Sequence, residues 1–166
     1  MFRALALTRF GQGDYPAHPS ATRSDGRADR LPAYTRPMLR KVLFNKIHMA
    51  TVTAAKPDYV GSITIDEDLL KATGLRVNDA VLVANCRNGN RFETYVFWGE
   101  PGSGKIELNG AAAHLVEPGD KVIIMHFAEM TDEEYAEHRP RVAIMGEGNK
   151  IERMMRYEPM DPSKGA

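Results

Sequence analysis

The chain has 166 residues, about the size of one domain, and 22 basic and 22 acidic residues give it a formal net charge of zero. This balance argues against a general nucleic-acid-binding protein, which carries excess basic charge to match phosphate. No apolar run reaches the roughly 18–20 residues of a membrane span, so neither a nucleic acid nor a membrane is expected as a partner. One cysteine, Cys86, excludes an internal disulfide framework and multi-cysteine metal centres, and favours a reducing, cytoplasmic location.

Residues 1–37 differ in composition from the rest of the chain. They contain six arginines and three aspartates among many Gly, Pro, Ser, Ala and Thr residues, without a sustained apolar period. Such a segment buries too little apolar surface to offset the entropy lost on ordering, so we expect a disordered N-terminal extension. A transit peptide and a translation start at Met38 are the two alternative interpretations of this leader.

From Met38 onward, short segments rich in β-branched and aromatic residues alternate with turns. The pattern predicts strands around residues 39–52, 59–65, 80–85, 91–98, 105–108 and 121–127. Asn88-Gly89 is typical of a hairpin turn between two of these strands. Short helices are predicted from Asp66 to Gly74, over 110–115 and after Thr131. Residues 38–150 are therefore predicted to form one domain, followed by a flexible C-terminal tail at 151–166.

The fold class that this pattern favours is mainly β. Many short strands, turns every 8–12 residues and only brief helices are typical of a small β-barrel with short helical insertions. The pattern alone does not distinguish one kind of barrel from another.

Three features look like chemical motifs but depart from them. Gly99-Glu-Pro-Gly-Ser-Gly-Lys105 has most of a phosphate-binding P-loop, but Ile106 stands where Ser or Thr would hold magnesium, and a strand follows instead of a helix. The histidines lack metal-ligand spacing, so no metal site is predicted. Cys86 is interpreted as a structural thiol. Nucleotide binding at Gly99–Lys105 stays open as a weaker alternative function.

Four polar segments stand where a plain barrel has no need of them: Asn45-Lys-Ile-His48, Tyr59-Val-Gly-Ser62, Arg91-Phe-Glu-Thr-Tyr95 and Asn109-Gly-Ala-Ala-Ala-His114. In their order and spacing they resemble the aspartate 1-decarboxylase family, from Met38 to about Asn149. The resemblance implies a double-psi β-barrel, assembled as a homotetramer with active sites between subunits.

The same resemblance implies a pyruvoyl enzyme that cleaves itself between Gly61 and Ser62. Attack of the Ser62 hydroxyl on the Gly61 carbonyl, followed by β-elimination and hydrolysis, would leave a covalent pyruvoyl group at position 62. This cofactor would bind the amine of L-aspartate as a Schiff base and accept the electrons left by CO₂. The product would be β-alanine for pantothenate biosynthesis.

The resemblance also implies a role for each matching residue. Ser62 and Tyr95 would be catalytic, with Tyr95 as the proton donor. Thr94 and Asn109 would assist cleavage by stabilising the oxyanion. Lys46 and Arg91 would bind the retained carboxylate, His48 and Tyr59 would line the site, and further substrate contacts would come from Thr94, Gly110, Ala111 and Ala112.

A non-catalytic double-psi barrel that serves as a binding or assembly module is the alternative function. It requires an inert Ser62 and one intact chain. The sequence leaves open whether cleavage is spontaneous or needs a maturation partner.

Overall fold

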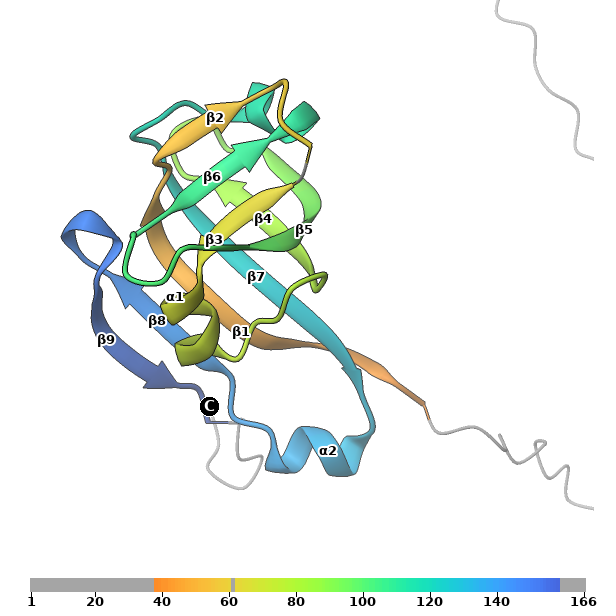
Figure 1. The fold of residues 1–166 in the computed structure, drawn as a ribbon. Coiled ribbons are helices and arrows are strands. Elements are labelled where there is room, and N and C mark those ends of the chain that lie inside the picture. Colours follow the sequence, from red (N-terminus) through yellow and green to blue (C-terminus); the bar gives the residue numbers. More distant parts are fainter. Residues whose placement is uncertain (1–37, 61, 159–166) are drawn as a thin grey trace, which may run out of the picture. The chain divides into compact units, whose positions relative to one another are not determined.

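The computed structural model describes residues 38–60 and 62–158 (Figure 1). The extension expected at 1–37, Gly61, and the last part of the expected tail at 159–166 lie outside the described residues. The elements of the described part are, in chain order, β1 (Arg40–Thr51), β2 (Ala54–Lys56), β3 (Ile63–Asp66), α1 (Glu67–Thr73), β4 (Ala80–Asn85), β5 (Arg91–Gly99), β6 (Ile106–Asn109), the 3-10 helix η1 (Gly110–Leu115), β7 (Lys121–Met130), α2 (Asp132–Glu137), β8 (Arg141–Met145), the 3-10 helix η2 (Glu147–Asn149) and β9 (Ile151–Arg156).

The nine strands form one mixed sheet in the order β2-β6-β3-β5-β4-β7-β1-β8-β9. The long antiparallel pair of β1 and β7 runs through its middle (Figure 1). The parallel pairs β1–β8, β3–β5 and β2–β6 join segments that are distant in sequence. The predicted mainly β class with short helical insertions is confirmed, and the sheet as described runs from β2 to β9 without closing on itself.

Buried and more exposed side chains alternate along the central strands, so the sheet has a buried face and an outer face. Ile47, Val83 and Ile124 are fully buried, and they lie on β1, β4 and β7. Because successive side chains of a strand point to opposite faces, their neighbours Lys46 and His48 fall on the outer face of β1. The core thus fixes which side chains of these strands are available for function.

Helix α1 follows the capping signals in its sequence. The Asp66 side chain accepts a hydrogen bond from the backbone N–H of Asp68, and Gly74 ends the helix with a φ of 82°. A positive φ suits glycine, which has no Cβ to clash. Leu69 and Leu70 are buried and anchor α1 to the sheet.

Part of the segment expected as a flexible tail is ordered. Residues Ile151–Arg156 form β9, which pairs antiparallel with β8. Most of its side chains are exposed, so its composition resembles that of a tail. Its order comes from backbone pairing with β8, which leaves no strong side-chain signature in the sequence.

Neither α-helix of the described ranges has the length and apolarity needed to cross a bilayer.

Candidate active site

Ser62 lies directly before β3 and is 6% exposed. β3 pairs in parallel with β5 and antiparallel with β6, so Ser62 stands between these two strands. Its Oγ accepts a hydrogen bond from the backbone N–H of Tyr95 (3.2 Å). Its carbonyl oxygen accepts another from the backbone N–H of Asn109 (2.8 Å). Three of the four polar segments therefore meet at Ser62, while Gly61 lies outside the described residues.

Asn109 is buried at the end of β6, and its side chain is held by Thr64. The Asn109 Nδ2 donates to Thr64 Oγ1 (3.0 Å), whereas the buried Asn109 Oδ1 has no partner among the described residues. A threonine hydroxyl can donate as well as accept. A half-turn of the amide would thus preserve the bond to Thr64 and present the NH₂ group instead. Asn109 can offer this site either an acceptor or a donor.

The backbone of Tyr95 contacts Ser62, whereas its side chain is exposed. Its N–H binds Ser62, while its side chain is 44% exposed and its ring centroid lies 6.0 Å from that of Phe97. Thr94 precedes it on β5, so the two side chains point to opposite faces. We call Ser62, Thr64, Tyr95 and Asn109 the Ser62 cluster.

The segment after Asn109 presents backbone instead of bulky side chains. It forms η1, and no side chain caps its N-terminus. The first N–H groups of a helix have no partner within the helix. Gly110 has a φ of 59°, in the left-handed region that favours glycine. Gly110, Ala111 and Ala112 thus place small side chains beside the backbone N–H groups at the start of η1.

The cationic candidates lie on one face of the sheet, in a line that crosses it from β5 to β1. Across β5, β4 and β7, Arg91 pairs with Ala84 and Ala84 with Ile123. Ile123 lies opposite the β-bulge in β1 that contains His48, and Lys46 is on the same face two residues earlier. We call Lys46, His48 and Arg91 the cationic row.

Lys46 affects the titration of His48 within this row. Burial, and to a smaller extent the Lys46 ammonium, lowers the pKa of His48, which favours its neutral form. The buried His48 Nδ1 has no partner in the described part of the chain. Lys46 Nζ donates to Tyr157 Oη (3.1 Å). Arg91 is exposed and has no ion-pair partner among the described residues, so its guanidinium is available to an anion.

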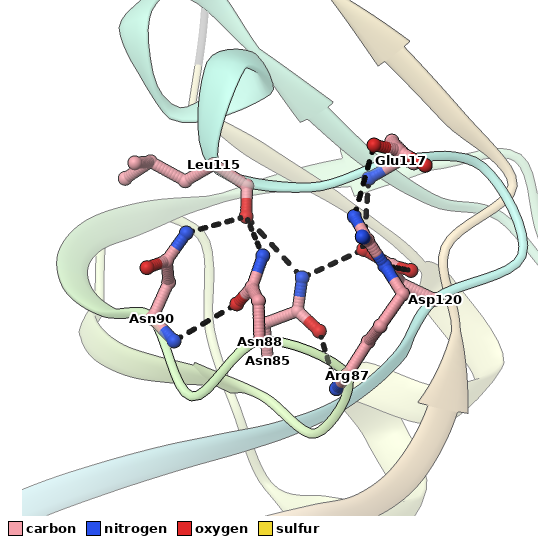
Figure 2. A network of polar contacts seen from close by, with 7 residues as sticks. All are labelled: Asn85, Arg87, Asn88, Asn90, Leu115, Glu117 and Asp120. Atoms are coloured by element: carbon pink, nitrogen blue, oxygen red, sulfur yellow. Dashed lines mark hydrogen bonds and ion pairs between the residues drawn. The ribbon is translucent and has the colours of Figure 1, made fainter.

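A polar network fixes η1 to the β4–β5 loop that precedes Arg91 (Figure 2). The Leu115 carbonyl at the end of η1 accepts hydrogen bonds from the side-chain amides of Asn85 (3.2 Å), Asn88 (3.4 Å) and Asn90 (3.3 Å). Because Arg91 directly follows Asn90, the network sets the position of η1 relative to the strand that carries Arg91 and Tyr95.

Asp120 is the buried anion of this network (Figure 2). Its carboxylate accepts hydrogen bonds from Asn85 Nδ2 (2.7 Å), from the Glu117 N–H (2.9 Å) and from Arg87. The hydrogen bond from Arg87 is the main reason that the pKa of Asp120 falls to about 2. Asp120 is therefore ionised at neutral pH and holds the loop in place.

The Ser62 cluster and the cationic row remain separate within one chain. Arg91 precedes Tyr95 by four residues on β5, about 13 Å at the rise of an extended strand. β1, which carries Lys46 and His48, is separated from β5 by β7 and β4. Tyr59 is 55% exposed, with Lys56 Nζ 5.9 Å from its ring centroid. The candidate residues thus form two groups instead of one pocket.

The glycine-rich loop at 99–105 binds a side chain of its own chain. The backbone N–H groups of Gly102 (3.1 Å) and Gly104 (2.6 Å) donate to the Asp66 carboxylate. β6 follows the loop where a P-loop would open a helix. Two amides that could have bound a phosphate are occupied, which argues against nucleotide binding there. Across the described ranges, no group of three or more His, Cys, Asp or Glu could hold a metal ion.

Comparison with protein families decides the membership of this chain. The family model described as aspartate decarboxylase matches residues 38–152. The chain belongs to the aspartate decarboxylase family. The match covers both the Ser62 cluster and the cationic row.

Curated relatives are similar along the same region. The aspartate 1-decarboxylase of Caldicellulosiruptor bescii is 57% identical over 117 residues, which cover 70% of this chain and 91% of that protein. The aspartate 1-decarboxylases of Bacillus subtilis and Neisseria meningitidis are 53% and 51% identical, each over 74% of this chain and 96% of theirs. Among solved structures, a computationally designed protein, msDPBB_sym2, has a TM-score of 0.39 and 26% identity, over 47% of this chain and 95% of its own.

Sequence reasoning on this family member missed two kinds of residue. Thr64 looked like an ordinary strand residue between two isoleucines, although its hydroxyl holds Asn109. Asn85 looked like the last residue of a strand, and Asn90 and Asp120 looked like loop residues, although their side chains fix η1. Asn85, Asn88 and Asn90 are close in the sequence, but a strand end and a hairpin turn already accounted for them.

Proposed function

We propose that the chain decarboxylates L-aspartate to β-alanine and CO₂ with a pyruvoyl group derived from its own Ser62, and so supplies β-alanine for pantothenate biosynthesis. The observation that carries this proposal is the Ser62 cluster in a chain of the aspartate decarboxylase family. Ser62 is buried and its Oγ accepts a backbone hydrogen bond from Tyr95. Asn109 stands beside it with an unpartnered amide oxygen.

The chain first cleaves itself between Gly61 and Ser62. Ser62 Oγ attacks the Gly61 carbonyl carbon, the C–O bond forms, the C–N bond breaks, and the hydroxyl proton passes to the freed nitrogen. Loss of the Ser62 Cα proton expels the Gly61 carboxylate and leaves dehydroalanine. Water then displaces the nitrogen as ammonia, which leaves a keto group at position 62. Thr94 and Asn109 stabilise the oxyanion of the first step.

The residues around position 62 fit a pyruvoyl group. This group has carbonyl oxygens that accept hydrogen bonds and no donor of its own. The N–H of Asn109 already donates to the carbonyl of residue 62 (2.8 Å), and a second N–H, from Tyr95, is aimed at its side chain. The unpartnered Asn109 Oδ1 suits the amine of a substrate. When present, the pyruvoyl group supplies a carbonyl that binds this amine and accepts the electrons left by CO₂.

Other residues orient the substrate and move its proton. The Arg91 guanidinium binds the retained carboxylate through two parallel hydrogen bonds, with Lys46 as a second cation. The backbone of Gly110, Ala111 and Ala112 borders the substrate. The Tyr95 phenol delivers the proton that replaces CO₂, while His48 and Tyr59 line the site.

The complete site forms between subunits of a homotetramer in the cytoplasm. In one chain β1, which carries Lys46 and His48, lies three strand spacings from β5, which carries Tyr95, so a second copy supplies Lys46. Residues 38–150 are the catalytic domain, and residues 1–37 are dispensable for the chemistry.

Intact mass measurement of the purified full-length protein tests the proposal. We expect a piece that ends at Gly61 and a second piece, residues 62–166, that begins with a pyruvoyl group and is trapped by aspartate with borohydride. Ser62→Ala remains whole and inactive, whereas the control Ser103→Ala, in an exposed loop, behaves as the wild type. A single uncleaved wild-type chain that leaves aspartate unchanged would favour the non-catalytic barrel instead.

A further inference from the structure

A cavity of about 420 Å³ is lined by residues at the end of α1, in the connection from α2 to β8, and on the β8–β9 pair. It shares no lining residue with the Ser62 cluster or the cationic row. Its lining residues come from five elements and their connections: Phe44, Thr73, Gly74, Arg76, Glu137, His138, Arg139, Arg141 and Arg156. Four of them are arginines and one is a carboxylate, so the lining is strongly cationic.

Two of the arginines face each other without a counter-charge. Arg141 on β8 and Arg156 on β9 are direct partners in the antiparallel register, so their side chains stand on one face about 5 Å apart at Cβ. Like charges at such positions destabilise a sheet. Within residues 38–60 and 62–158, neither guanidinium has a carboxylate within 4.0 Å. The fold alone gives no reason for this arrangement.

The other two arginines are already paired and frame the cavity. Arg76 lies 3.6 Å from Asp79, and Arg139 forms an ion pair with Glu158. Arg141 is also constrained, because a Cβ added at Gly74 would lie 3.4 Å from its Nη1. Glycine at the end of α1 therefore leaves room for this guanidinium. The Arg141 and Arg156 forks are the groups left to bind a ligand.

We propose that this cavity binds a phosphate-bearing small anion, with the phosphate between Arg141 and Arg156. A phosphate can accept two hydrogen bonds from each of two guanidinium forks and neutralise both charges, whereas one carboxylate would leave a positive charge uncompensated. The cavity volume falls within the range of about 300–1,000 Å³ of small-molecule sites. On its wall, Phe44 stacks on His138, with ring centroids 5.0 Å apart and planes 6° apart. The proposal stands whether or not the chain decarboxylates aspartate.

Calorimetric titration of the full chain tests this site, with inorganic pyrophosphate and adenosine diphosphate as probes at constant ionic strength. We expect saturable binding of at least one probe, and at least tenfold weaker binding by Arg141→Gln and by Arg156→Gln. Arg153→Gln is the matched control, because it removes the same charge from β9 on the opposite face. Equal affinity for both probes indicates a site for the free anion, and tighter binding of the nucleotide indicates a phosphorylated metabolite.

Thermal unfolding without phosphate separates a binding role from a structural one. Because the two arginines repel each other, Arg156→Gln is expected to have a Tm equal to or above that of the wild type in phosphate-free buffer, and to lose the rise in Tm that pyrophosphate causes in the wild type. Absence of saturable binding by both probes would overturn the proposal. The proposal would also be overturned if Arg153→Gln weakened binding as strongly as Arg141→Gln. A change of oligomeric state in Arg141→Gln, without binding of either anion to the wild type, would overturn it as well.

Discussion

Tyr95 offers a way to separate cleavage from turnover at the level of one residue. Its backbone N–H contacts Ser62 Oγ, whereas its phenol is exposed on the outer face. Tyr95→Phe keeps the N–H and removes only the proton donor. We expect full cleavage, measured by intact mass, and a fall of about 10²–10⁴ in kcat, the usual contribution of general acid catalysis. Normal turnover would assign protonation to another group, and failed cleavage would give the phenol a role in processing.

Thr64 is a positioning residue for Asn109, through one hydrogen bond of 3.0 Å. Thr64→Val preserves the shape of the side chain and removes the hydroxyl, so the Asn109 amide loses its partner. A hydrogen bond contributes about 1 kcal/mol, and we expect cleavage to slow about fivefold to tenfold. Thr64→Ser is the matched control and should restore the rate. An unchanged rate of cleavage in Thr64→Val would show that Asn109 is oriented by other contacts.

The contrast between Ser62 and Thr64 shows what the sequence could reveal about single residues. Ser62 stands in one of four segments whose order and spacing resemble a family, and that resemblance singled it out. Thr64 has no such signal, because its function depends on β3 and β6 being paired, which brings it beside Asn109. Side chains that act by orienting another residue emerge only when the strand register is known.

At the level of elements, the network around Asp120 links stability to pH. The pKa of its carboxyl is lowered to about 2 from an ordinary 3.8. A lowered pKa in the folded state contributes stability that is complete above pH 3.8 and is lost as the pH falls through about 2. Because Arg87 is half exposed, we expect a contribution of only about 1–2 kcal/mol. Chemical unfolding between pH 2 and 7 measures this contribution. The free energy of unfolding of Asp120→Asn should be lower than that of the wild type at neutral pH, and the difference should shrink toward pH 2.

The same network connects stability to substrate binding. Asp120→Asn frees Asn85 and Arg87, so η1 loses part of its attachment to the β4–β5 loop. A displaced η1 would raise the KM for aspartate more than it lowers kcat. The control is Asp58→Asn, an exposed carboxylate outside the network. If Asp120→Asn alters neither KM nor stability, the network has no positioning role.

Elements whose ends are marked by capping residues could be predicted from the sequence. Strands that are stabilised only by pairing with another strand could not. Asp66 and Gly74 delimit α1 through caps that can be read from the sequence. β8 and β9 have no comparable signal, because β9 is mostly exposed and depends on its partner strand. The bulge at His48 and Met49 is likewise invisible in the sequence, although Met49 has a φ of 65° and the bulge sets the register opposite Ile123.

At the scale of the whole molecule, the strand order bears on how many chains build the proposed site. Lys46 lies on the outer face of β1, and Ser62 lies beyond β7, β4 and β5 in the order of the sheet. Both are required by the proposed reaction, and four strand spacings, about 19 Å measured along the sheet, separate β1 from β3. The family resemblance supplied the tetramer as an expectation, and the strand order supports the proposal that Lys46 and Ser62 of one site come from different chains.

Complementation between two inactive variants tests this division of the site. Ser62→Ala lacks the pyruvoyl group, and Lys46→Ala lacks a substrate-binding cation, so each homotetramer should be inactive or severely impaired. If a site takes Ser62 from one chain and Lys46 from its neighbour, a random mixture of the two variants contains intact sites at about one in four positions. Co-expression followed by an aspartate decarboxylation assay should therefore recover roughly a quarter of the wild-type activity. Because no mixture can rebuild a site whose Ser62 and Lys46 come from the same chain, a mixed tetramer without activity would place both residues in one subunit's site.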